Sequence, residues 1–234
     1  MMGCATATDE SNAPESEIAE SESPIIGGAI DQGDPGVVLV RFGRGSYCTG
    51  EVVSPHVVTT AAHCVKGKSG WTVDTTYDGR GTRRTVKEAY YHPSYSGTLG
   101  KYDVGVLILN DALSVTPIPL NRRALQNSDI GKNVRIIGYG DSTLDGNGYG
   151  KRRQATVKIV SFASTSVTIG NVRTDGKVQC YGDSGGPALL SIDGVERIIG
   201  FDSGNHSDVC DQDDLNTRAD TTVGFIDPYI EKYH

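Results

Sequence analysis

The sequence predicts an all-β fold, a many-stranded barrel or sandwich, from three observations. Glycine is abundant, with 30 residues in a chain of 234. Short segments rich in valine recur between turn residues, as is typical of many-stranded β proteins. Helical periodicity is not the main pattern, and no repeat of roughly twenty to fifty residues indicates a solenoid or propeller. The length allows one large β unit or two small domains and does not choose between them.

The predicted strands form two consecutive sets that follow the N-terminal segment. The first set covers residues 37–42, 51–53, 56–60, 82–90, 104–109 and 134–138, and the second covers 154–162, 166–169, 187–192 and 198–201. The chain closes with a segment in which Asp227 can cap a helix, Pro228 suits its first turn, and Ile226, Ile230 and Tyr233 fall on one face. A short C-terminal helix that docks on the β body is therefore predicted.

Residues 1–24 are rich in Glu, Ser, Ala and Thr and carry almost no large apolar side chain. Such a segment cannot offset its ordering entropy, so it is predicted to be a disordered pro-segment or tether. Its first four residues, Met-Met-Gly-Cys4, resemble the end of a bacterial lipoprotein signal, whose cysteine receives lipid. This suggests a truncated start. The alternative is a free thiol in a disordered tail.

Charge and cysteine content exclude several classes of function. A net charge of −7 and a pI near 5.2 disfavour nucleic-acid binding, which depends on clustered Lys and Arg. None of the five cysteines lies in a CxxC pair, so neither a zinc ribbon nor a thioredoxin-like site is supported. Bridges between Cys48 and Cys64 and between Cys180 and Cys210 are plausible and would place the protein in an oxidising, extracytoplasmic compartment. Cys4 is then left over.

Three short motifs occur in one order along the chain: Thr-Ala-Ala-His63-Cys64, Tyr-Asp103-Val-Gly-Val-Leu and Gly-Asp-Ser184-Gly-Gly-Pro. A serine hydroxyl is a poor nucleophile unless a base takes its proton, and imidazole does this best when a buried carboxylate fixes its tautomer. Each motif taken singly is as well explained by a structural histidine, a strand-end aspartate or a turn. Their joint occurrence favours a catalytic set.

With these motifs the chain, from Ile25 to about Tyr233, resembles the chymotrypsin/trypsin-like serine endopeptidase superfamily. The resemblance implies two perpendicular, antiparallel, six-stranded β-barrels with a catalytic cleft between them, spanning a domain at residues 25–234. It also implies that His63 is the general base, Asp103 its orienting carboxylate and Ser184 the nucleophile of an acyl-enzyme mechanism. The backbone N–H groups of Gly182 and Ser184 would form the oxyanion hole. No cofactor and no metal are expected.

The segment Ile25-Ile26-Gly27-Gly28 is similar to the mature N-terminus of that family. There the new amine pairs with the carboxylate that precedes the nucleophile, which here is Asp183. The sequence departs from the family at Pro24, because family activation usually follows Arg or Lys. The resemblance therefore predicts an activating cut before Ile25 by a protease of different preference.

The resemblance places four residues at the primary substrate pocket. Val178 would form its floor and suit apolar or aromatic side chains, and Ser203 would lie at its entrance. Asn205 stands where the family commonly has glycine, as does Asp214, whose carboxylate could bind Arg or Lys. The alternative explanation of Asp214 is a solvated acidic loop that it shares with Asp211 and Asp213.

The sequence thus predicts a serine endopeptidase that is secreted or otherwise extracytoplasmic and acts on proteins or peptides. A monomer is expected, with membrane attachment only through lipid on Cys4. The alternatives are a catalytically silent binding or regulatory relative, and a lipid-anchored adhesin with a vestigial triad. The basic clusters at residues 83–84, 122–123 and 151–153 are interpreted as scattered, solvated surface. The last of them could also be a self-cleavage site.

Overall fold

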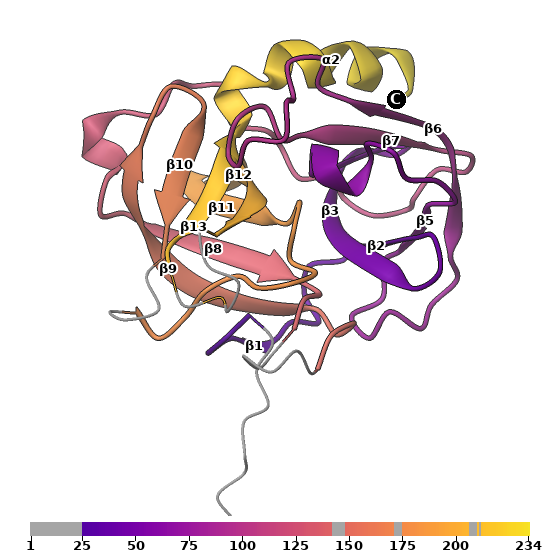
Figure 1. Cartoon of the computed structure of the whole chain (residues 1–234), viewed down its shortest axis with the longest axis horizontal. Coiled ribbons are helices and arrows are strands. Elements are labelled where there is room, and N and C mark those ends of the chain that lie inside the picture. The colour runs from indigo at the N-terminus through magenta and orange to yellow at the C-terminus, as the bar shows by residue number, and fades with distance from the viewer. Residues whose placement is uncertain (1–24, 142–147, 171–174, 206–209, 211) are drawn as a thin grey trace, which may run out of the picture.

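The structure, a computed structural model, describes residues 25–141, 148–170, 175–205, 210 and 212–234. The predicted tether at residues 1–24, with Cys4, lies outside the described residues. Two β-barrels stand side by side, and the C-terminal helix lies across one end of both (Figure 1). The predicted pair of closed six-stranded antiparallel barrels with a short C-terminal helix is therefore confirmed.

The first barrel closes in the order β2-β3-β4-β7-β6-β5, with every pairing antiparallel. Val38 and Val40 point into it and are fully buried, whereas the alternate residues Val37 and Leu39 pack toward the second barrel. Both faces of β2 are thus covered over residues 37–40, which explains why these four residues are all apolar. The strands are β2 Val37–Phe42, β3 Ser46–Ser54, β4 Val57–Thr60, β5 Thr72–Asp74, β6 Arg84–Tyr91 and β7 Gly105–Leu109.

The second barrel has the order β9-β10-β13-β12-β11-β8 and closes through the additional pairing of β8 with β9. The two-residue strand β1, Ala29–Ile30, adds to the edge of β9. Its own apolar core includes Ile136, Ile159 and Ile169. The strands are β8 Asn133–Gly138, β9 Arg153–Phe162, β10 Ser166–Ile169, β11 Pro187–Ile192, β12 Val195–Asn205 and β13 Asp214–Arg218.

The C-terminal helix, α2 Val223–Lys232, begins earlier than predicted. A 3-10 turn at Ala219–Thr221 leads directly into it, so that Thr222 accepts from the N–H groups of Phe225 and Ile226. Pro228 consequently lies inside the helix and Asp227 does not cap it. Asp227 instead forms an ion pair with Arg122. The expected capping role of Asp227 is wrong because the preceding turn already nucleates the helix.

An apolar cluster at the junction of the barrels holds them together. It combines Val37 and Ile108 of the first barrel, Phe201 of the second, and Ile226 of the helix, each at most 1% exposed. No helix in the described part of the chain is long and apolar enough to cross a bilayer.

Arg152 forms a polar tie between the barrels. Its guanidinium is 1% exposed, pairs with Asp31, and donates to the carbonyls of Val37 and Thr75. A buried, fully engaged arginine cannot enter a protease cleft without local unfolding. The interpretation of the cluster at residues 151–153 as solvated surface is therefore wrong for Arg152 and Arg153, which are buried, whereas Lys151 is exposed as predicted.

Candidate active site

His63 and Asp103 form a short hydrogen-bonded pair in which only the carboxylate is buried. The imidazole Nδ1 lies 2.8 Å from Asp103 Oδ2, and the backbone N–H of His63 donates to Oδ1 of the same carboxylate over 2.9 Å. Asp103 is 1% exposed, whereas the His63 side chain remains 35% exposed. The carboxylate thus fixes Nδ1 as the protonated nitrogen and leaves Nε2 to act on a substrate-side group.

Local backbone structure sets this pair. His63 lies on the 3-10 turn Ala62–Cys64, which follows directly from strand β4. Tyr102 adopts φ +56, an uncommon conformation for a non-glycine residue, just before Asp103 enters the barrel junction. The hydroxyl of Ser203 donates to Asp103 Oδ2 over 2.6 Å and accepts from the N–H of Gly100. The Asp103 carboxylate is thus hydrogen-bonded to His63 of the first barrel and to Ser203 of the second.

The pKa of His63 reflects opposing influences. Burial alone would lower it, but the hydrogen bond and charge of Asp103, with a smaller contribution from the charge of Asp202, outweigh that effect. The pKa is therefore raised above its ordinary value. A base of raised pKa accepts a proton more readily, but it is also protonated, and therefore inactive as a base, up to a higher pH.

Ser184 lies on a tight loop that requires two glycines. Gly182 adopts φ +92, and a side chain there would collide with the ring of Tyr47. Gly185 adopts φ +83, and a side chain there would collide with Ala61 and Thr60, next to His63. Because only glycine tolerates both the conformation and the approach, these two positions let the serine loop reach the histidine segment.

Thr49 of β3 orients the backbone of the same loop. Its hydroxyl donates to the carbonyl of Gly182 over 2.9 Å, and its N–H donates to the carbonyl of Ser184 over 2.9 Å. Neither Gly182 nor Ser184 donates its own N–H to any described residue. Both donors are thus left for a ligand oxygen, as an oxyanion hole requires.

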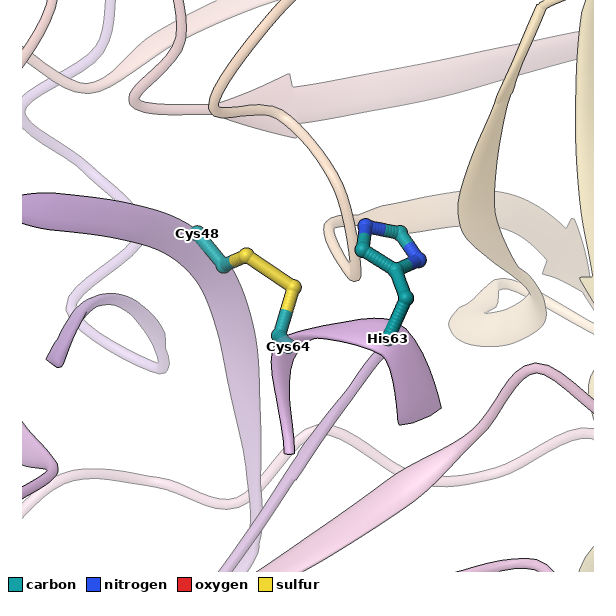
Figure 2. A group of neighbouring side chains, drawn as sticks. All are labelled: Cys48, His63 and Cys64. Atoms are coloured by element: carbon teal, nitrogen blue, oxygen red, sulfur yellow. A yellow bond between two sulfur atoms is a disulfide. The ribbon is translucent and has the colours of Figure 1, made fainter. Parts of the chain in front are cut away.

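Both expected disulfides are present, Cys48–Cys64 and Cys180–Cys210. Figure 2 shows the first of them tying β3 to the turn that carries His63. Cys48, His63 and Cys64 lie close enough together to suggest a metal site. However, the two sulfurs are bonded to one another and are not thiolates, so the grouping is explained by the disulfide.

His63 and Ser184 line a common cavity of about 260 Å³. Sites for drug-sized molecules measure roughly 300–1,000 Å³, so this volume suits a single side chain. Of the four predicted pocket residues, Ser203 and Asn205 line the cavity. Val178 and Asp214 lie behind its wall. Val178 is fully buried against Ile26 and the Cys180–Cys210 disulfide.

Asp214 is buried in the second barrel rather than in a solvated acidic loop. It is 1% exposed, and its Oδ2 accepts from the N–H of Gln179, a residue of the cavity wall. Its Oδ1, the amide Nε2 of Gln179 and Oδ1 of Asn216 have no hydrogen-bond partner among the described residues. Burial and the neighbouring charge of Asp202 raise the pKa of Asp214 well above its usual range.

Asp202 is a cavity residue that the sequence motifs do not identify. It lies on β12 next to Ser203, is 2% exposed, and lines the cavity with His63 and Ser184. Its Oδ1 accepts from the N–H of Gly204, and it forms no ion pair with a described Lys or Arg. Burial raises its pKa to about 7. The available signal was an aspartate that directly follows the apolar segment at residues 198–201.

Asp183 is fully buried next to the predicted nucleophile. Its carboxylate accepts from the N–H groups of Gly140 and Cys180, and burial raises its pKa to about 8. Ile25 is also fully buried, in the core of the second barrel, and Ile26 exchanges two backbone hydrogen bonds with Val178. Ile25 adopts φ +45, which is a genuine outlier for a β-branched residue.

Comparisons with known proteins agree with this geometry. A family profile described as Trypsin matches residues 25–226. A trypsin from Saccharopolyspora erythraea is 28% identical over 185 residues, which cover 71% of this chain and 79% of that protein. Coagulation factor IX from Oryctolagus cuniculus is 27% identical over 80% of this chain and 77% of its own. Hypodermin-A from Hypoderma lineatum is 28% identical over 74% and 76%.

Two closed antiparallel barrels with a histidine–aspartate pair at their junction define a two-barrel serine peptidase. The chain belongs to the trypsin family and is a serine endopeptidase that acts on peptides or proteins.

Proposed function

We propose that the chain hydrolyses peptide bonds through an acyl-enzyme formed on Ser184. The Ser184 hydroxyl attacks the scissile carbonyl while His63 Nε2 takes its proton, and Asp103 stabilises the resulting imidazolium. His63 then gives that proton to the leaving amine, and a water molecule, deprotonated in turn by His63, releases the acid product. The observation that carries this proposal is the 2.8 Å His63–Asp103 hydrogen bond at a cavity that Ser184 also lines.

The N–H groups of Gly182 and Ser184 would stabilise the tetrahedral oxyanion of both steps. Thr49 supports this role because it holds the two carbonyls of the loop. One such donor is worth about 3 kcal/mol of barrier in related chemistry.

An acyl-enzyme predicts burst kinetics. With an activated ester, whose acylation is faster than deacylation, we expect a rapid release of about one leaving group per enzyme before the steady state. Stopped-flow absorbance measures the burst. The chain with Ser184→Ala is the control and should show none. A steady state without a burst, with the acylated serine never trapped, would contradict the covalent intermediate.

We further propose that cleavage before Ile25 activates the chain. The strained φ of Ile25 supports this, because a residue that begins a chain has no preceding carbonyl and therefore loses the steric conflict. The buried Asp183, which lacks a cationic partner among the described residues, would gain the new amine as its partner. The pairing would lower the pKa of Asp183 and order the neighbouring serine loop.

We propose that the cavity binds a cationic side chain, Arg or Lys, on the acyl side of the scissile bond. Asp202 lines the cavity, and the carboxyl group of Asp214 lies behind the wall formed by Gln179. Burial raises the pKa of both groups, and the charge of Asp202 raises that of Asp214 further. A guanidinium or ammonium group entering the cavity would relieve both effects.

Replacing Asp202 by asparagine should lower kcat/KM for an arginine substrate by about 100-fold, because it removes one partner of a buried charge pair. The matched substrate with citrulline, an uncharged isostere of arginine, should be little affected. Both are measured on the alkaline plateau, where His63 is neutral. Asp193→Asn makes the same change at an exposed turn and should alter neither substrate. Equal losses on arginine and citrulline, or a wild-type preference for Glu or Leu, would overturn the assignment.

The protein is also proposed to work outside the cytoplasm, because both disulfides persist best in an oxidising compartment. A monomer and lipid attachment at Cys4 remain proposals of the same kind.

A further inference from the structure

A second cavity, of about 420 Å³, opens on the first barrel. Arg41, Arg83, Tyr47 and Tyr149 are among the residues that line it. The rings of Tyr47 and Tyr149 stack with centroids 4.6 Å apart and form one wall. The cavity contains no catalytic residue, yet it concentrates positive charge on a chain whose net charge is −7.

Strand register connects this cavity to the catalytic loop. Tyr47 on β3 lies directly opposite Arg41 on β2, which in turn lies opposite Thr72 on β5. Residues paired in this way share one face of the sheet, with Cβ atoms about 5 Å apart. Tyr47, Arg41 and Thr72 thus form one cross-strand row. At the Tyr47 end of this row, the tyrosine ring occupies the space that a side chain on Gly182 would need. The cationic cavity is therefore one strand away from the loop of Ser184.

The two arginines are incompletely neutralised. Arg83 is exposed and forms no ion pair with a described residue. Arg41 donates to the carbonyl of Gly79, while its Nη1 lies 3.7 Å from the buried Asp74 and has no hydrogen-bond partner in the described part of the chain. Burial and the charge of Arg83 lower the pKa of Arg41. An incoming carboxylate would reduce the repulsion between them.

We propose that this cavity is a subsite for an acidic side chain, Asp or Glu, on the leaving-group side of the scissile bond. The inference rests on the proposed function. The side chain on the acyl side occupies the cavity of the second barrel, so the peptide beyond the scissile bond must continue on the other side of Ser184. Tyr47 of the first barrel does not line that cavity, and its ring lies against Gly182 of the serine loop. Arginine suits this role because its planar fork binds carboxylates in bidentate fashion.

The test uses peptides that share one acyl side and carry either Glu or the isosteric Gln at each of the first four positions after the scissile bond. At one position the wild type should prefer Glu by about tenfold in kcat/KM, and the preference should fall as salt rises. Arg83→Gln should abolish the preference and leave Gln peptides unchanged. Arg41→Gln should do the same where it folds. Arg197→Gln, on the second barrel, is the matched control and should keep the preference.

Two further measurements separate this inference from the proposed function. An anilide substrate with the same acyl side has no residue after the scissile bond, so Arg83→Gln should hydrolyse it at the wild-type rate. Binding of the Glu and Gln peptides to the Ser184→Ala chain reports the subsite without hydrolysis. Equal treatment of Glu and Gln at all four positions, or a Glu preference that survives in Arg83→Gln, would overturn the inference. Failure of wild-type hydrolysis with Glu-selective binding retained would overturn the proposed function alone.

Discussion

Replacing Ser184 by alanine should lower kcat by about 10⁶-fold, because the change removes the nucleophile and leaves only the oxyanion donors and substrate binding. The fold should survive, since Ser184 is joined to the first barrel through its backbone carbonyl and not through a described side-chain bond. Steady-state hydrolysis of a peptide amide by the processed chain measures the effect.

Ser191→Ala is a matched control for that result. Ser191 lies exposed on β11, away from the cavity, so the same chemical change there should leave kcat unaltered. A Ser184→Ala chain that retains a tenth or more of the wild-type rate would exclude Ser184 as the nucleophile.

Replacing Asp103 by asparagine should lower kcat by about 10⁴-fold, since an amide no longer fixes the His63 tautomer or stabilises its charged form. The substitution should also change the pH profile. Asp103 helps raise the pKa of His63, and the base works only when neutral. Wild-type kcat/KM should therefore rise with pH, and the midpoint of this rising limb should lie above pH 6.5, the ordinary pKa of histidine. In Asp103→Asn the midpoint of this limb should move to lower pH.

The pH profile distinguishes orientation from structural damage. A destabilised fold would lower activity at all pH values without moving the limb toward acid. Ser203→Ala provides a graded comparison, because it removes one hydrogen bond to the same carboxylate and keeps its charge. An unchanged limb in Asp103→Asn, at any activity, would contradict the role given to Asp103.

The fold and the catalytic motifs could be predicted from sequence because their signals are local. Alternating or continuous apolar runs mark most of the strands, and each motif around His63, Asp103 and Ser184 is a contiguous segment of a few residues. Three strands are absent from the predicted sets: β1, β5 and β13. The first two have only two or three residues, too few to show an alternation of apolar and polar side chains, and β13 has a single apolar residue. The helix start was misplaced because Pro228 suggested a first turn that lies further upstream.

The charges around the site could not be predicted because they depend on distant residues. In the sequence Asp202 is one polar residue after the apolar segment at residues 198–201, and only barrel closure brings it near His63. From the sequence Arg152 is interpreted as a surface charge, yet the fold buries it between the barrels. Its partner Asp31 is 121 residues away in sequence. Arg41 and Arg83 share a cavity only because β2, β5 and β6 are neighbours.

The most direct test of the account is the intact mass of the purified chain after exposure to a fluorophosphonate, beside Ser184→Ala. We expect one phosphonyl adduct on the wild type, on a species that begins at Ile25, and none on the variant. That result would establish the nucleophile and the activating cut together. No adduct on a wild-type chain confirmed to begin at Ile25, or an equal adduct on Ser184→Ala, would contradict the central claim that this serine carries the chemistry.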